Sequence, residues 1–81
     1  MDDIPRAERA RAICSDELVV EAFDTIEKTY LDKFRNSEPE DTEARETSYA
    51  MLRALQEFRG HFESVITTGK LKREQLKKLR I

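Results

Sequence analysis

Residues 44–66 carry the longest regular apolar pattern in the chain, with steps that alternate between four and three residues. Such a 3.5-residue repeat keeps one stripe of a helix facing a partner helix, as in a coiled coil. Leu52 and Ile66 lie beside the stripe and widen it, which is typical of a helix in a globular bundle. The pattern therefore predicts a long helix that ends near Thr68. Its stripe consists of Ala44, Ser48, Met51, Leu55, Phe58, Phe62 and Val65.

A second apolar stripe of matching length precedes the first and ends near Arg35. Ser15 is a suitable N-cap for this helix, and the acidic residues after it complement the helix dipole. Asn36 and Ser37 end the helix, so only a short connection remains before the long helix. Short connections join antiparallel neighbours, and the two helices are predicted to form a helical hairpin. The second stripe consists of Val19, Phe23, Ile26, Tyr30 and Phe34.

The start of the long helix has two interpretations. Ser37 and Glu40 have the spacing of a capping box, and Pro39 suits a first helical turn. A cap at Asp41 or Thr42 is the alternative, and the sequence favours neither.

Shorter helices are expected on both sides of the hairpin. Pro5 and the segment rich in Ala and Arg after it predict a short helix over residues 5–13. Gly69 is expected to end the long helix, because glycine enters the left-handed conformation without strain. Gly60, inside that helix, either allows another backbone to approach or lies on a solvated face. Residues 70–81 are predicted to form a separate, basic amphipathic helix.

Composition agrees with an all-α fold. The chain has 81 residues with only two glycines, two prolines and one cysteine, so neither a turn-rich β fold nor a disulfide framework is expected. We predict a hairpin domain over residues 1–69 and a basic tail over residues 70–81. Chains this short bury only about 60% of their unfolded surface, and small cores often gain stability by oligomerising. A homo-oligomer is therefore the first prediction about partners.

Charge is divided unequally along the chain, although the net charge is only −2. Residues 70–80 hold six basic side chains and one acidic one, a charge of +5 that leaves −7 for residues 1–69. The tail can dock on the acidic part of its own chain or of another copy, which we favour, or it can contact nucleic-acid phosphates. Its apolar face is too small to predict a membrane surface as partner. The basic residues concerned are Lys70, Lys72, Arg73, Lys77, Lys78 and Arg80.

No combination of residues predicts catalysis, a metal or a cofactor. Cys14 and His61 are the only residues of their kinds, so a zinc site with four Cys or His ligands cannot be assembled. The acidic cluster at residues 38–46 lacks EF-hand spacing and is typical of a helix start. Residues 68–70 lack the upstream glycine of a phosphate-binding loop. We therefore expect a protein that is not an enzyme.

The cysteine content, the first residues and the short apolar runs predict a cytoplasmic protein. A single cysteine suits a reducing compartment. Met1 is followed by two aspartates rather than by a basic and apolar leader, and no apolar run is long enough to cross a membrane.

Several short motifs resemble a group of small helical proteins found in bacteriophages and prophages, most of them uncharacterised. The resemblance implies a non-enzymatic protein that is encoded near virion-assembly genes, and it supplies no catalytic residues. It also implies a location in the host cytoplasm or in association with the virion. The motifs are AERAR at 7–11, EAFD at 21–24, PED at 39–41, ARE at 44–46, LRAL at 52–55 and TGKL at 68–71.

Three hypotheses about function follow. The first is a helical oligomer with a structural or assembly role, which also grips a larger protein partner. The second is a nucleic-acid accessory protein that acts through the basic tail. The third is a small inhibitor that binds a host protein through the acidic residues between positions 16 and 46.

Overall fold

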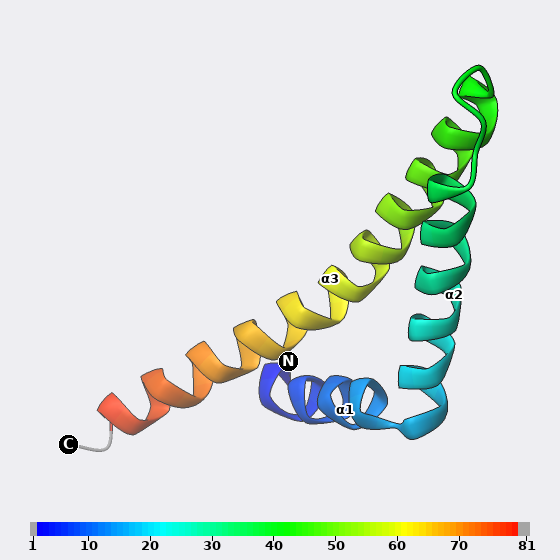
Figure 1. Ribbon diagram of the computed structural model, residues 1–81. Coiled ribbons are helices and arrows are strands. Elements are labelled where there is room, and N and C mark those ends of the chain that lie inside the picture. The colour runs from blue at the N-terminus through cyan, green and yellow to red at the C-terminus, as the bar shows by residue number, and fades with distance from the viewer. Residues whose placement is uncertain (1, 80–81) are drawn as a thin grey trace.

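The computed structural model describes residues 2–79, which fold into three α-helices without a strand (Figure 1). α1 spans Asp3–Ser15, α2 spans Glu17–Arg35 and α3 spans Thr42–Leu79. The prediction of an all-α fold is confirmed for this part of the chain.

α1 and α2 meet at Asp16, which is the N-cap of α2. Its carboxylate accepts hydrogen bonds from the backbone N–H groups of Leu18 and Val19, at 2.9 and 3.3 Å. The predicted cap at Ser15 is wrong by one position, because Ser15 is the last residue of α1. The negative charge of Asp16 also favours its place at the positive end of the α2 dipole.

A loop over residues 36–41 joins α2 to α3. Asp41 caps α3, since its side chain accepts a hydrogen bond from the Ala44 N–H at 3.0 Å. Arg45 closes the loop by donating from Nη1 to the carbonyl oxygens of Glu38 and Pro39, at 2.8 and 2.7 Å. The structure thus selects the later of the two starts that the sequence left open for α3.

α3 continues through Gly69, so the predicted end near Thr68 and the separate tail helix are both wrong. Gly69 does not have a positive φ. It is buried against α1, where a Cβ on Gly69 would overlap Ala7 and lie 2.8 Å from the carbonyl oxygen of Asp3. Nothing lies within 4 Å of a Cβ built on Gly60. The glycine that lets two helices approach is therefore Gly69, and Gly60 lies in open surroundings.

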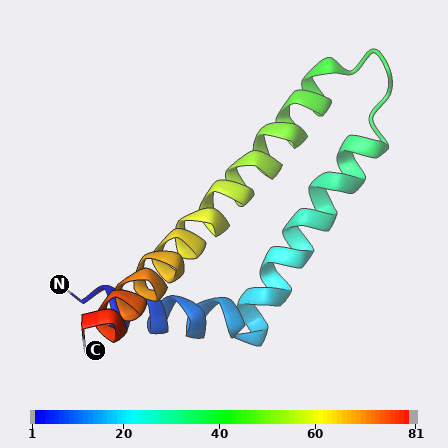
Figure 2. The same ribbon diagram turned by 90° about the vertical axis from the view of Figure 1, so that its left-hand side faces the viewer.

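The three helices form an open, elongated frame with extents of 63 × 23 × 18 Å. Its radius of gyration is 17.9 Å, whereas a compact chain of this length has roughly 12 Å. α2 leads to the loop and α3 leads back from it, and the two helices separate with distance from the loop (Figure 1). α1 crosses the C-terminal half of α3, and the view turned by 90° also shows α1 beside this half of the helix (Figure 2).

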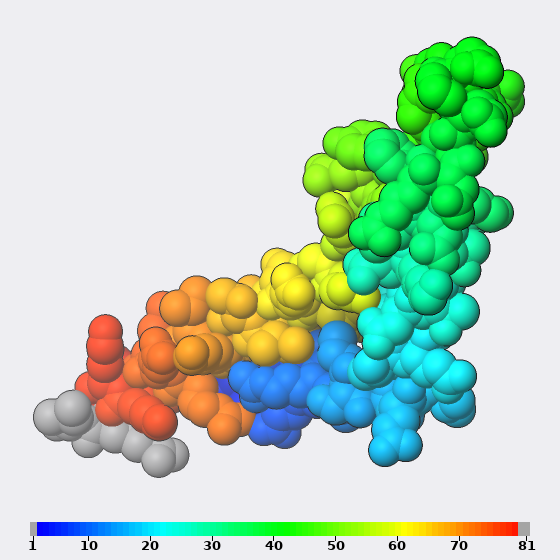
Figure 3. All heavy atoms as spheres, viewed as in Figure 1, coloured from blue at the N-terminus to red at the C-terminus, as the bar shows by residue number. Residues whose placement is uncertain are grey.

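The core is small and lies where α1 crosses α3. Ala7 and Ala10 are the buried apolar residues of the described chain, at 2% and 4% exposure. Figure 3 shows α1 lying against α3 and the beginning of α2, while the loop end projects away from this contact. Most large apolar side chains therefore lie outside any core.

Candidate oligomerisation surface

The predicted apolar stripes lie largely in the open. None of the large side chains in residues 2–79 is fully buried, and Phe58 is 61% exposed. Ile26 and Met51 are also exposed. The remaining predicted members are half-buried, and they are Val19, Phe23, Tyr30, Leu55, Phe62 and Val65. Phe58 still contacts Phe23 of α2 but keeps most of its surface in solvent, so one copy of the chain does not cover its own stripe.

A groove of about 450 Å³ lies between α2 and α3, and every side chain that lines it is apolar. Leu18, which is 74% exposed, lines the groove although it is not a member of the predicted stripes. Its spacing of four residues from Ala22 and eight from Ile26 places it on the same face of α2, and this signal could have found it. The groove is lined by Leu18, Val19, Ala22, Phe23, Ile26, Leu55 and Phe58.

An aromatic cluster lies at this groove and extends beyond it along α3. The ring of Phe58 lies 5.9 Å from that of Phe23 on α2 and 5.4 Å from that of Phe62 on α3, measured between centroids. The Arg59 guanidinium lies 4.8 Å from the Phe23 ring and 3.9 Å from the Glu27 carboxylate. Such aromatic and cation–π contacts orient the rings. Phe58 is thus held in place while most of its surface faces solvent.

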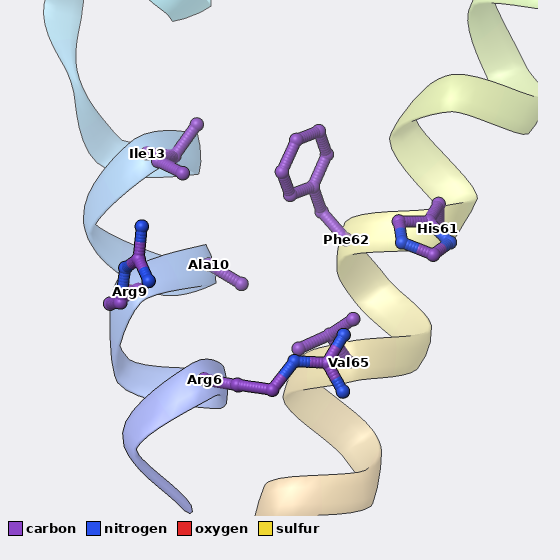
Figure 4. A pocket seen from close by; sticks show the side chains of 7 residues that line it. All are labelled: Arg6, Arg9, Ala10, Ile13, His61, Phe62 and Val65. Atoms are coloured by element: carbon purple, nitrogen blue, oxygen red, sulfur yellow. The ribbon is translucent and has the colours of Figure 1, made fainter. Parts of the chain in front are cut away.

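A smaller pocket of about 150 Å³ lies between α1 and α3 (Figure 4). The side chain of Arg6 reaches from α1 toward Val65 on α3, and Arg9 and His61 add further polar groups. All three polar side chains are exposed. The pocket therefore has no buried polar group that would fix a ligand, and we assign no binding site to it.

The predicted basic residues extend along the exposed last turns of α3, and the start of α1 places Asp2 and Asp3 in the same depression as Lys72. Nη2 of Arg73 lies 2.7 Å from Oε1 of Glu8 on α1, so this cation is already paired. The sequence did not reveal that acidic residues from the start of the chain and from α1 lie beside the basic end. Arg80 lies outside the described residues. The exposed basic residues in the last turns of α3 are Lys70, Lys72, Arg73, Lys77 and Lys78.

The opposite end of α3 is acidic. Residues 36–46 hold five exposed carboxylates and one base, Arg45, which is half-buried and bound to the loop carbonyls. The two ends of α3 therefore carry opposite charge. The exposed carboxylates are those of Glu38, Glu40, Asp41, Glu43 and Glu46.

Asp32 on α2 lies one helical turn from a lysine with which it pairs. A hydrogen bond of 2.8 Å from Lys28 Nζ lowers the pKa of Asp32 below its usual value, and the charges of Lys28 and Arg35 act in the same direction. Within residues 2–79, no three His, Cys, Asp or Glu side chains are grouped as metal ligands would be. None of the described helices combines the length and the apolar character that crossing a bilayer requires.

Comparison with protein-family models, curated protein sequences and solved structures finds no match to this chain. The resemblance to small bacteriophage proteins therefore stays a prediction from the sequence motifs.

Proposed function

We propose that this protein is a non-enzymatic helical assembly protein that forms a homo-oligomer through the apolar groove between α2 and α3. In this proposal α2 and the first half of α3 act as an antiparallel hairpin, and a second copy covers its open face. The oligomer then has a structural or accessory role and binds a larger protein partner.

The excess surface of the single chain is the observation that carries this proposal. Its accessible surface is 6631 Å², whereas a compact monomer of 9.5 kDa exposes roughly 5,000 Å². If each of two copies covered its excess, the interface would bury about 3,000 Å² in total, which is in the range of obligate homodimers. The frame is therefore better suited to an assembled state than to a monomer.

The side chains at the edges of the groove indicate where the energy of assembly comes from. Leu18 and Phe58 are 74% and 61% exposed on either side of an apolar floor. Covering one such side chain completely contributes roughly 1.5–3 kcal/mol. Exposed apolar patches of this kind mark interaction surfaces.

The solution mass tests the proposal directly. Light scattering on a sizing column at low and high salt should give a discrete oligomer at both salts, because apolar contacts survive screening. A monomer at all micromolar concentrations would overturn the proposal.

A matched pair of variants tests the place of contact. Tyr49 is as exposed as Phe58, at 59% against 61%. It lies nine residues away, about two and a half turns, and therefore on the opposite face of α3. Phe58→Ser should dissociate the oligomer, whereas Tyr49→Ser should leave it intact. Equal effects of the two changes would contradict the groove as the interface.

The proposed phage origin is supported by the sequence motifs, and it predicts a protein of the host cytoplasm or of the virion. Sequencing the genes on either side tests this origin, and a neighbourhood without any virion-assembly gene would contradict it. Mass spectrometry of purified particles then distinguishes the two locations.

Nucleic-acid binding through the basic end is the second candidate function. Its support is the row of exposed cations on the last turns of α3, of which only Arg73 forms an ion pair within residues 2–79. Phosphate contacts of this kind weaken steeply with salt. A gel-shift titration at low salt tests it. The absence of a shift, or a shift that survives deletion of residues 70–81, would rule it out.

A further inference from the structure

We propose that the second copy packs antiparallel, so that the basic end of α3 in each copy lies against the acidic loop end of the other. This inference rests on the proposed homo-oligomer and specifies its geometry. The unit is then a dimer with a two-fold axis near Glu57, and each copy contributes both a basic and an acidic contact.

The position of the groove along α3 places the two charged ends at equal distances from its centre. Leu55 and Phe58 are the α3 residues that line the groove, so an axis through their contact passes near Glu57. Thr42, where the acidic loop joins α3, and Lys72 in the basic end each lie fifteen residues from Glu57. At about 1.5 Å per residue, both are about 23 Å from the axis along the helix. Antiparallel copies that meet at the groove therefore bring each basic end to an acidic end.

The segments that this axis pairs have equal and opposite charge. Residues 36–44 contain four acids and no base, which gives −4. Residues 70–78 contain five bases and one acid, which gives +4. A parallel arrangement would place two +4 segments together and two −4 segments together. Charge complementarity of this kind fixes orientation, because juxtaposed like charges are penalised.

Most of these charges have no partner in the described chain. The ion pairs formed by residues 2–79 are Lys28–Asp32, Arg59–Glu27 and Arg73–Glu8. None of them involves the four lysines of residues 70–78 or the acids of residues 36–44. The acidic loop end and the last turns of the basic end are therefore open to another copy, whereas Lys72 shares a depression with Asp2 and Asp3 of its own chain.

Apolar contacts accompany the charges at the basic end. Leu76 lies eighteen residues beyond Phe58, which is about five full turns and thus the same face of α3. Leu76 and Leu79 are 53% and 81% exposed, and they line an open depression of about 630 Å³ beside the start of α1. The loop end offers Phe34, which is 41% exposed. Exposed ion pairs alone contribute little, so these apolar residues supply affinity while the charges set the direction.

Charge reversal tests the geometry at both ends. The tail variant K72E/K77E/K78E changes residues 70–78 from +4 to −2, and the acid variant E38K/E40K/E43K changes residues 36–44 from −4 to +2. Each variant alone places like charges together in the antiparallel dimer. We expect the dissociation constant to rise at least about tenfold in each at low salt. The charge-reversal control is Arg53→Glu, an exposed site on α3 outside both segments, and it should have a smaller effect.

The variant that combines all six changes distinguishes orientation from folding. It restores opposite charges in the antiparallel dimer but leaves like charges together in a parallel one. It also carries the unfavourable helix-end charges of both parents, so recovery of the dimer cannot come from a more stable helix. We expect its dissociation constant to return toward that of the unchanged protein, with circular dichroism confirming helix content. A combined variant as weak as its parents would overturn the inference.

Cross-linking gives a direct view of the contact. A zero-length carbodiimide reagent joins amines to carboxylates that touch, and mixing ¹⁴N and ¹⁵N protein identifies links between copies. We expect links from Lys77 or Lys78 to Glu38 or Glu40 of the second copy. A discrete dimer without such links, and with the same affinity in every charge variant, would overturn the antiparallel geometry alone. A monomer under all conditions would overturn the proposed function with it. A gel shift that the tail variant abolishes while dimer affinity is unchanged would assign the basic end to nucleic acid instead.

Discussion

The backbone of Gly69 lies against Ala7, so close that a methyl group on Gly69 would overlap the Ala7 side chain. This contact lies within the crossing between α1 and α3. Ala7 and Ala10 are buried there because small side chains let the helix axes approach, and no large residue of the described chain is buried to the same degree. The packing of α1 on α3 thus depends on the small size of Gly69, Ala7 and Ala10.

Gly69→Ala should destabilise the protein although alanine is the better helix former. Alanine gains about 1 kcal/mol in a helix interior, but here the new Cβ also meets the carbonyl oxygen of Asp3 at 2.8 Å, so backbone must move. Urea unfolding and amide exchange in α1 measure the effect. Gly60→Ala is the control, because its Cβ meets nothing within 4 Å, and it should stabilise by about 1 kcal/mol. Equal stabilisation by both changes would contradict the close crossing.

Asp16→Ala should weaken α2 by about 1 kcal/mol, because it leaves the N–H groups of Leu18 and Val19 without their acceptor. Thermal unfolding followed by circular dichroism measures the loss. Ser15→Ala is the matched control, since Ser15 precedes the cap and should cost much less. A larger effect at Ser15 would restore the cap that the sequence suggested.

Replacing Leu55 and Phe58 together with alanine should cost several kcal/mol of combined folding and assembly free energy. These side chains form the α3 wall of the groove and, through Phe58, the aromatic cluster. For the unchanged protein, the melting temperature should rise with protein concentration, because assembly stabilises the folded chain. The double variant should lose this dependence. A double variant that stays assembled would show that the apolar stripe is not the interface.

The pair of Lys28 and Asp32 should make a small, pH-dependent contribution to stability. The hydrogen bond from Lys28 lowers the pKa of Asp32 from its ordinary value of 3.8, so the folded protein holds this proton less tightly than the unfolded chain. The contribution is therefore complete above that value and is lost as the pH falls through the lower, folded pKa. NMR titration of the Asp32 carboxyl carbon should show the lowered pKa in the native protein. Lys28→Ala should return it toward the ordinary value.

The sequence by itself determined that long helices form and where α2 stops, because apolar periods and helix-stop signals are local properties of the chain. It placed the cap of α2 one residue early and ended α3 at Gly69, where the helix in fact continues. The stripe at residues 44–66 and the stop at Asn36 both lie where the pattern places them. Only the tertiary structure decided the role of Gly69, since a glycine can end a helix or admit a neighbour, and the choice depends on what packs against it. It also decided that Phe58 is exposed, because burial depends on the angle at which α2 and α3 separate. That angle comes from α1, which joins the beginning of α2 and packs on the far half of α3 through contacts distant in sequence.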